Sequence, residues 1–548
     1  MREALRRNTA RAQTAQVRSI PAPYGGWDTD SPVTAMPKEN AVVLDNAIPR
    51  GGYVELRRGF VEQCTGTAAA VETLIPYRGS AAGHKIFAAT GAYLYDVTTR
   101  GSLPAASYSS AASARWNHIQ FANDAGAWMI AMNGAQAPIK YNGTAFSVAT
   151  ITGTAGVITL DPTDLKYLMG HKNRIHMIEK ETLRVWFLAA NAVQGAAELL
   201  DLGPVFSDGG YLVGLCRLTL DGGQGIDDMA VYLTTEGQVA IYQGYDPSDA
   251  VNWSLVGVYK IPRPIGDRCL VEHGADVLVL TEGGLLSLTA ALRSARDKQS
   301  EGAISRTINP TVAEGARLYG ENFGWGVVSY PGRGGLLMIN VPTAELDTSE
   351  QWVMSTPTRA WCRFTGIPAY CWGQANGEIY FGSEAGVYRW DVAASDNSEP
   401  IVADILPAFQ AFGSGAQTKV FTMVRALLRA PAIIQPAMEV VTDYDMDTAP
   451  TAVQTVVAPG DVSEEDSRLI RNDWTGAAGS GYVASPRMRI SVIGADDVAQ
   501  VAVTSDLTEL LLVGPGGTDN ILTRPNLPLD VTVQCVGFDV MFQAGGQL

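Results

Sequence analysis

The chain has 548 residues, of which 46% are hydrophobic and 18% are charged, so it can bury a large core. Lys and Arg total 40 and Asp and Glu total 56, which gives a formal net charge of -16 at pH 7. This acidity argues against a protein that coats nucleic acid or an anionic membrane, because both require clustered Lys and Arg. No apolar run reaches the roughly 18 residues of a membrane-spanning helix, so the sequence predicts no membrane span.

The first 19 residues are basic, although the chain as a whole is acidic. They contain one acidic residue, Glu3, and five arginines, which are Arg2, Arg6, Arg7, Arg11 and Arg18. An Arg-rich, acid-poor start is typical of an organellar transit peptide. It is equally consistent with an arm that docks on an acidic partner.

Residues 25–60 are polar and rich in Gly and Pro, but they carry scattered apolar side chains that a plain linker lacks. We therefore expect residues 1–60 to form an arm and anchoring strap, with a flexible leader as the alternative. The candidate docking residues are Arg6, Arg7, Arg11, Trp27 and Tyr53.

From about residue 84, short apolar runs rich in β-branched and aromatic residues alternate with Gly, Asn and Asp, which predicts β-hairpins. Seven units share this pattern, with anchors at Ile86, Trp128, Ile175, Val231, Val277, Val327 and Ile379. The anchors are 42, 47, 56, 46, 50 and 52 residues apart. A period of about 40 to 50 residues with several strands is typical of propeller blades.

The sequence thus predicts an all-β fold: a diverged β-propeller of about 6–8 blades over residues 61–400. A sandwich or an arrangement of several barrels is the alternative. Residues 288–314 have helical composition and predict a helical insertion between blades. The repeat stops near residue 400, so residues 401–548 are expected to form a C-terminal β-rich platform domain.

The motifs of common enzymes and metal sites are missing from the sequence. There is no CxxC pair, HExxH, Walker A loop or GxSxG elbow. Asp443, Asp445 and Asp447 alternate as in a calcium loop, but Thr448 and Gln454 stand where an EF-hand needs Gly and Glu. We predict no catalytic residue, cofactor or metal, and no enzyme, although an active site of scattered residues in a propeller channel stays open.

The six cysteines are spread through the chain and are expected to be reduced core residues; they are Cys64, Cys216, Cys269, Cys362, Cys371 and Cys535. A disulfide between Cys362 and Cys371 is the alternative. The segment GDVSEEDS predicts an exposed acidic loop, with Asp461, Glu464, Glu465 and Asp466 within six residues.

Several phrases occur in the order found in a known family. They include GGWDTDSPVTAMPKENAVVLDNAIPRGGYVELRRGF near the start, AFQAFGSGAQTKVFTMVRALLRA after residue 400 and VTVQCVGFDVMFQAGGQL at the end. In this order they resemble the tail nozzle (tail tubular protein B-like) proteins of short-tailed double-stranded DNA phages. The similarity spans most of the chain, and the order of the phrases carries it.

The resemblance implies a virion structural protein that forms a homo-oligomeric ring, commonly of six copies, below the portal and adaptor. It implies contacts with the portal-adaptor protein and with tail fibre or spike and tail-tip proteins, and DNA that passes without specific binding. The location would be the virion tail, and the host cytoplasm during assembly. The acidic loop would then face either the channel or the outside.

A second functional hypothesis is a propeller that binds or cleaves carbohydrate in receptor recognition. Trp361 and Trp372 are the aromatic residues considered for stacking on sugars. Both alternate with their neighbours like packed strand residues, which favours a place in the core.

Overall fold

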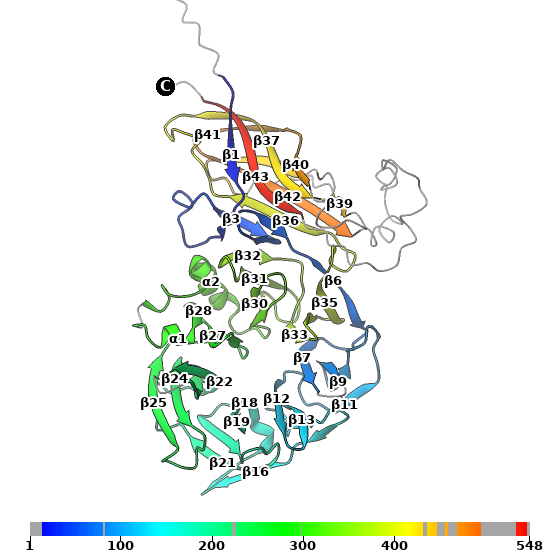
Figure 1. Cartoon of the computed structure of the whole chain (residues 1–548), viewed down its shortest axis with the longest axis vertical. Coiled ribbons are helices and arrows are strands. Elements are labelled where there is room, and N and C mark those ends of the chain that lie inside the picture. Colours follow the sequence, from blue (N-terminus) through cyan, green and yellow to red (C-terminus); the bar gives the residue numbers. More distant parts are fainter. Residues whose placement is uncertain are drawn as a thin grey trace, which may run out of the picture. The chain divides into compact units, whose positions relative to one another are not determined.

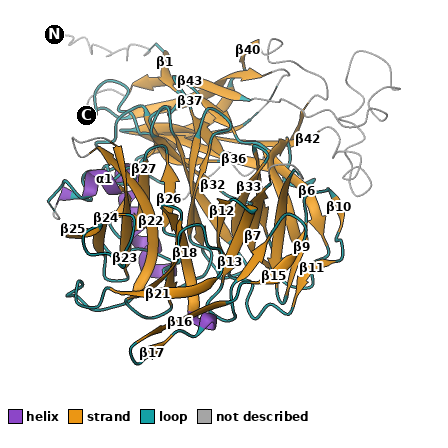
Figure 2. Ribbon diagram, turned by 60° about the horizontal axis from the view of Figure 1, so that its bottom comes forward, coloured by secondary structure: helices purple, strands orange, loops and turns teal. Residues whose placement is uncertain are grey.

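The computed structural model describes residues 14–79, 83–221, 226–295, 298–430, 434, 436–446, 455–458, 468–494 and 533–544. The chain splits into two compact units. One is Arg58–Asn397, compared with the expected 61–400, and the other combines Met1–Arg57 with Ser398–Leu548. Figure 2 shows that strands make up nearly all of the regular structure.

Six small sheets of Arg58–Asn397 are arranged as a β-propeller around a common centre (Figure 1), and this unit contributes one further four-stranded meander. The first two sheets are β7 (Val71–Arg78), β8 (His84–Thr90), β9 (Tyr93–Asp96) and β11 (Ala106–Ser109), then β12 (Asn117–Asn123), β13 (Gly126–Met132), β14 (Ile139–Tyr141) and β15 (Phe146–Val148). The third is β18 (Leu165–His171), β19 (Arg174–Glu179), β20 (Arg184–Leu188) and β21 (Gly195–Asp201), extended by β16 (Ile151–Ala155) and β17 (Ile158–Thr159).

The next sheets follow the same up-and-down order. The fourth is β22 (Leu212–Asp221), β23 (Ile226–Thr234), β24 (Gln238–Gly244) and β25 (Trp253–Lys260), and the fifth is β26 (Leu270–His273), β27 (Asp276–Thr281) and β28 (Gly284–Ser287). A further meander comes after the fifth sheet: β29 (Gly326–Tyr330), β30 (Leu336–Pro342), β31 (Ser349–Ser355) and β32 (Ala360–Phe364).

The last sheet closes the propeller with strands from both ends of the unit. It consists of β33 (Cys371–Ala375), β34 (Glu378–Gly382), β35 (Gly386–Ala393), β6 (Gly59–Thr65) and β10 (Gly101–Ser102). Phe60 of β6 packs edge-on against Phe381 of β34, with ring centroids 4.9 Å apart. The Cys371 thiol of β33 donates to the carbonyl of Val71, 3.4 Å away, at the start of β7. First and last sheets therefore touch, as closure of a propeller requires.

All seven predicted hairpins are present, and the predicted propeller class is confirmed. The tight turns follow local chemistry: Asn376 and Gly377 join β33 to β34 with φ values of 56° and 80°, which fits a type I′ turn. One of the seven anchors, Val327, was aligned with the wrong strand of its unit. Val327 lies on the first strand of its meander, whereas the other six anchors lie on the second, because the helical insertion before β29 shifts the period.

The helical insertion follows β28 directly. Its elements are α1 (Leu288–Ala291), η3 (Arg306–Ile308) and α2 (Asn309–Tyr319), and a separate short helix, η1 (Pro162–Asp164), precedes β18. The Ser287 hydroxyl accepts a hydrogen bond from the backbone N–H of Ala290 and caps α1. On α2, a Cβ at Gly315 would lie 2.7 Å from the Trp352 ring, so this glycine lets the helix pack closely on β31.

The second unit contains two sets of paired strands. One sheet consists of β1 (Gln16–Pro21), β4 (Ala47–Pro49), β5 (Val54–Leu56), β37 (Lys419–Ala430), β40 (Arg468–Arg471), β41 (Thr475–Gly481) and β43 (Gln534–Ala544). The other set is β2 (Gly26–Trp27), β3 (Asn40–Asp45), β36 (Ile401–Pro407), β38 (Ala437–Thr442), β39 (Thr455–Ala458) and β42 (Ala484–Gly494).

This second unit corrects the expectation of a separate N-terminal strap. β1 pairs with β43 along its whole length, and β3 pairs with β36. Trp27 is 8% exposed, so it belongs to the core of the unit and cannot serve as a surface anchor. Tyr53 is half-buried at the turn between β4 and β5, and Arg6, Arg7 and Arg11 lie outside the described residues. Residues 14–57 are therefore strands of the same unit as the C-terminal region, because their apolar side chains complete its core.

Candidate ligand-binding site at the propeller centre

A cavity of about 300 Å³ lies at the centre of the propeller. Its wall comes from the first strand of each meander, namely β7, β12, β18, β22, β26, β29 and β33, from the residues just before several of them, and from Asn340 of β30. Leu74, Leu168, Leu215 and Leu270 make much of the wall apolar. The cavity is at the lower end of the sizes that proteins use for small molecules.

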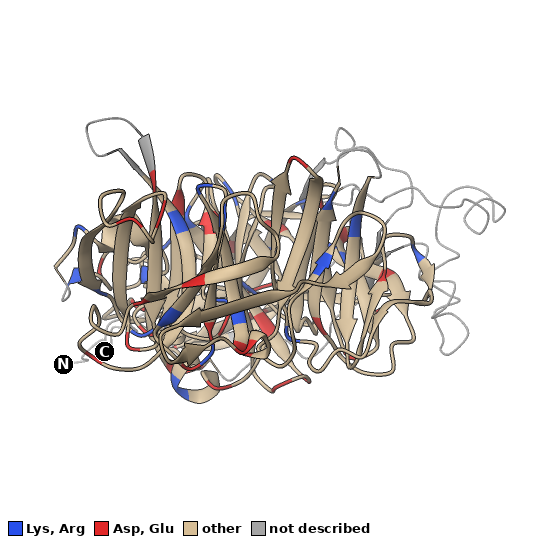
Figure 3. Ribbon diagram, turned by 90° about the horizontal axis from the view of Figure 1, so that it is seen from below, with Lys and Arg blue, Asp and Glu red and all other residues tan. Residues whose placement is uncertain are grey.

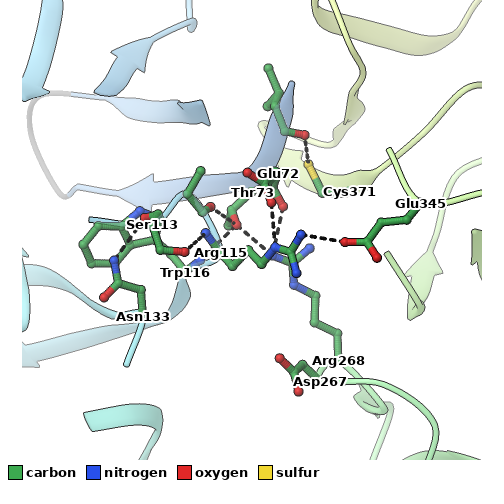
Figure 4. Close-up of polar contacts among 12 residues, drawn as sticks. Glu72, Thr73, Ser113, Arg115, Trp116, Asn133, Asp267, Arg268, Glu345 and Cys371 are labelled. Carbon is green, nitrogen blue, oxygen red and sulfur yellow. Dashed lines mark hydrogen bonds and ion pairs between the residues drawn. The ribbon is translucent and has the colours of Figure 1, made fainter. Parts of the chain in front are cut away.

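A polar network lies where these inner strands begin (Figure 4). The Arg115 guanidinium forms ion pairs with the carboxylates of Glu72 and Glu345, each at 2.7 Å. The Thr73 hydroxyl donates to the carbonyl of Ala114 at 2.7 Å and accepts from the backbone N–H of Trp116 at 3.0 Å. These contacts tie the starts of β7 and β12 together and fix the backbone around the cavity.

Arg268 precedes β26, and its side chain crosses to β7. Its Nη2 donates to the Thr73 hydroxyl at 2.7 Å and to the carbonyl of Glu72 at 3.1 Å. The guanidinium carbon lies 5.1 Å from the centre of the Phe323 ring, a cation–π contact. Burial lowers the pKa of this guanidinium. Among the described residues, no carboxylate lies within the 4.0 Å of an ion pair with it.

Asp267, the neighbouring residue, is in contrast fully paired. One carboxylate oxygen accepts from the Tyr167 hydroxyl at 2.6 Å, and the other lies 2.8 Å from the Lys166 ammonium. Burial acts to raise the pKa of this carboxyl, but the Lys166 charge and the two hydrogen bonds outweigh it, and the pKa is lowered. Asp267 is therefore an ionised group with both oxygens engaged.

His118 is the second polar group of the cavity, after Arg268, that has nitrogen atoms available for hydrogen bonds to a ligand. Burial, together with the nearby charge of Arg268, lowers its pKa to about 4. The imidazole is therefore neutral at pH 7, with one nitrogen as donor and the other as acceptor. Neither nitrogen makes a hydrogen bond within the part of the chain that the structure describes.

The structure places the two tryptophans of the carbohydrate hypothesis differently. Trp361 is fully buried, as expected. Trp372 is half-buried, lines the cavity, and donates from Nε1 to the Asn340 side-chain oxygen at 2.9 Å. The sequence pattern did not identify Arg268 or His118 as site residues, because no motif links them. The one feature that could have identified them is a polar residue at the start of an inner strand.

The aspartates of the rejected calcium loop and the acidic loop belong to the C-terminal region of the sequence. The Asp443 carboxylate accepts the backbone N–H groups of Tyr482 and Val483, at 2.8 and 3.2 Å, so it has a structural role in a turn. Asp447 falls outside the described residues, as do Asp461, Glu464, Glu465 and Asp466 of the acidic loop. Within the described ranges, no group of three His, Cys, Asp or Glu side chains is arranged to hold a metal.

All six cysteines are buried free thiols, as predicted. Burial raises the pKa of Cys371, which lines the cavity, to about 11, so its thiol stays protonated at pH 7. In the same described ranges, no helix is both long and apolar enough to cross a membrane.

No protein-family model and no curated protein matches the chain. Matches to solved structures are at low identity. BBS1N in complex with ARL6DN is 9% identical over 61% of this chain and 96% of that chain, with a TM-score of 0.36. Chaetomium thermophilum Raptor is 8% identical over 61% and 29%, with a TM-score of 0.37. YCF48 from Cyanidioschyzon merolae is 9% identical over 61% and 98%, with a TM-score of 0.35. The chain is a β-propeller protein by the strand order described above.

Proposed function

We propose that the chain is a structural subunit of a phage tail nozzle: a homo-oligomeric ring, of about six copies, that docks on the portal-adaptor complex and through which the genome is ejected. Fibre or spike and tail-tip proteins would bind the same ring. The sequence resemblance is the basis of this proposal, and one structural observation supports it.

That observation concerns the phrases LDNA and LRRGF, which belong to the resemblance. Asn46 of the first phrase is 2% exposed and has a φ of 56°. Its side-chain oxygen accepts from the Arg57 Nε of the second phrase at 2.7 Å, and its side-chain nitrogen donates to the carbonyl of Val402 at 2.8 Å. The two phrases are thus joined to each other and to β36. A structural role of this kind explains why such phrases would recur in a family of scaffold proteins.

The size of the central cavity decides where DNA would pass. A volume of about 300 Å³ suits a small molecule and is far too small for a duplex. The genome would therefore pass along the axis of the ring, between copies, and not through the centre of any one propeller.

The charge of the chain fits a conduit that DNA passes without binding. Basic and acidic residues are interspersed along the ribbon (Figure 3), and the formal net charge is -16. Acidic walls repel phosphates over a Debye length of about 8 Å at physiological salt. The loop with Asp461, Glu464, Glu465 and Asp466 would add to this repulsion if it faces the lumen.

Electron microscopy and mass measurement of the purified full chain test the proposal. The expected result is a closed ring of identical copies with an open axis. A protein that stays monomeric at every concentration would contradict it. Replacing the four acids of the loop by Gln or Asn then tests the channel: assembly should persist, and slower ejection is expected only if the loop faces the lumen.

The cavity favours a second candidate function, a propeller that binds or cleaves carbohydrate in receptor recognition. Trp372 lines the cavity beside polar groups, as aromatic rings do in sites for small polar ligands. Glycan binding by the isolated monomer, or loss of a glycan polymer on incubation, would support this candidate over the nozzle.

A further inference from the structure

We propose that the central cavity of the propeller binds a small carboxylic acid, with the carboxylate on Arg268 and His118 and the body of the ligand against Trp372 and the leucines. The proposal rests on neither candidate function. It follows from the charges, the unused hydrogen-bond donors and the size of the cavity.

The first step is the charge pattern at the inner-strand starts. Lys166 pairs with Asp267, and Arg115 pairs with both Glu72 and Glu345. Arg268 is the remaining cation of this group, and no carboxylate within ion-pair distance of it is found among the described residues. Arg268 is half-buried, and holding a cation partly out of water without a carboxylate at ion-pair distance is costly.

The free protein tolerates Arg268 because the network is neutral overall. The cations Lys166, Arg115 and Arg268 balance the carboxylates of Asp267, Glu72 and Glu345. When an anion binds, one negative charge is left over. Solvent reduces the cost of this charge, because the Glu345 side chain of the network is 41% exposed.

The unused groups of the cavity are mainly donors, and this selects an acidic ligand. Nη2 of Arg268 donates hydrogen bonds to the Thr73 hydroxyl and the Glu72 carbonyl. Its Nε and Nη1 have no hydrogen-bond partner among the described residues. Neutral His118 adds one N–H. Asp267 is the carboxylate among the described residues of the cavity wall, and both its oxygens are engaged, so these residues offer no unpaired carboxylate to a cationic ligand.

A carboxylate fits better than a phosphate. The site offers one unpaired cation, and the described part of its wall is built from strands and strand connections, so no helix N-terminus adds positive potential. A phosphate carries about 1.5 to 2 negative charges at pH 7 and would leave a larger uncompensated charge in a buried site.

The rest of the cavity sets the body of the ligand. A volume of about 300 Å³ accepts a molecule of roughly monosaccharide size. One side offers the half-buried ring of Trp372, and the leucines offer an apolar wall. Small acids with a ring or a short apolar body suit this surface.

Titration calorimetry of the full chain tests the proposal with three probes: glucuronate, glucose and inorganic phosphate. Glucuronate is expected to give saturable binding, and glucose, which lacks the carboxylate, and phosphate are expected to bind at least about tenfold more weakly. In Arg268→Gln the affinity for glucuronate should fall by about tenfold or more, and in Arg268→Lys it should fall less, because the charge remains.

Two further variants control the experiment. His118→Phe should weaken glucuronate binding by a few-fold while the cation stays, which keeps the test informative if Arg268→Gln fails to fold. Arg263→Gln removes an arginine that is 59% exposed and outside the cavity wall, and should bind glucuronate like the unmodified chain.

The proposal is overturned if glucuronate gives no saturable heat, if folded Arg268→Gln binds glucuronate as the unmodified chain does, or if phosphate binds more tightly than glucuronate. Ring formation is measured separately by microscopy. A ring without carboxylate binding would overturn this inference alone, and a monomer that binds carboxylate would overturn the nozzle alone.

Discussion

His176 and His118 are both histidines whose pKa is lowered by burial, but their surroundings differ. His176 is fully buried between neighbouring sheets, and its ring stacks on Phe187 and Trp253, with centroids 5.9 Å away in each case. Its Nδ1 shares a hydrogen bond of 2.9 Å with the Tyr232 hydroxyl. His118 faces the central cavity and makes no hydrogen bond within the described residues.

This difference separates two uses of a polar side chain inside the propeller. At His176 the protein itself fills the space around the ring, including Nε2, which has no hydrogen-bond partner among the described residues, so the residue stabilises the interface between sheets by packing. At His118 and Arg268 the protein leaves space and donors unused, and we infer that a ligand fills them. The comparison predicts that substitutions at the first site lower stability and that substitutions at the second site lower binding.

The largest effect on stability is expected for Trp253→Ala. The Trp253 ring is 7% exposed and stacks on Tyr242 at 5.3 Å and on His176. Removing a packed tryptophan costs about 3–5 kcal/mol in the free energy of unfolding, through lost burial and the remaining cavity. Denaturant unfolding with tryptophan fluorescence and circular dichroism measures it.

The control for this variant lies two residues away. Val251 is 90% exposed, and Val251→Ala should change the free energy of unfolding by less than about 0.5 kcal/mol. Equal losses for the two variants would mean that the sheets do not pack here as described.

The next effect is a pH dependence of stability due to His176. Burial lowers its pKa to about 3, with smaller contributions from His171 and Arg174, whereas in the unfolded chain a histidine titrates near 6.5. The unfolded chain therefore binds more protons below pH 6.5, and stability is lost as the pH falls toward 3. Between pH 6.5 and 4.5 this residue should account for about 2 kcal/mol.

Comparison with His176→Phe isolates this contribution from that of the carboxylates. Phe keeps the stacking and cannot be protonated, so the loss of stability between pH 6.5 and 4.5 should be smaller in the variant by about 2 kcal/mol. Identical pH profiles would show that His176 is accessible to protons in the folded chain.

Much of the architecture could be predicted from the sequence, because hairpins have local signals. Alternating apolar residues and turns such as Asn376–Gly377 mark each strand pair. The pairing of β1 with β43 could not be predicted, because it joins residues more than 500 positions apart and depends on the complete core. The cavity was missed for a similar reason, since Thr73, His118 and Arg268 come from three different sheets.

Apart from the control Val251→Ala, the smallest change in stability is expected for Arg268→Met. The variant loses the hydrogen bonds to Thr73 and to the Glu72 carbonyl, but it also removes a half-buried cation that has no carboxylate within ion-pair distance among the described residues. These effects oppose each other, so the free energy of unfolding should change by less than about 1 kcal/mol. A loss above about 3 kcal/mol, similar to that of Trp253→Ala, would assign Arg268 a structural role.

The distinction between the two histidines is tested most directly by NMR of histidine-labelled protein during a titration with glucuronate. The chain has five histidines, so each imidazole signal can be assigned by substitution. We expect the His118 signal to shift with a saturable dependence on glucuronate, while those of His171 and His176 stay in place. No shift at His118, or equal shifts at all five histidines, would contradict a ligand site at the centre of the propeller.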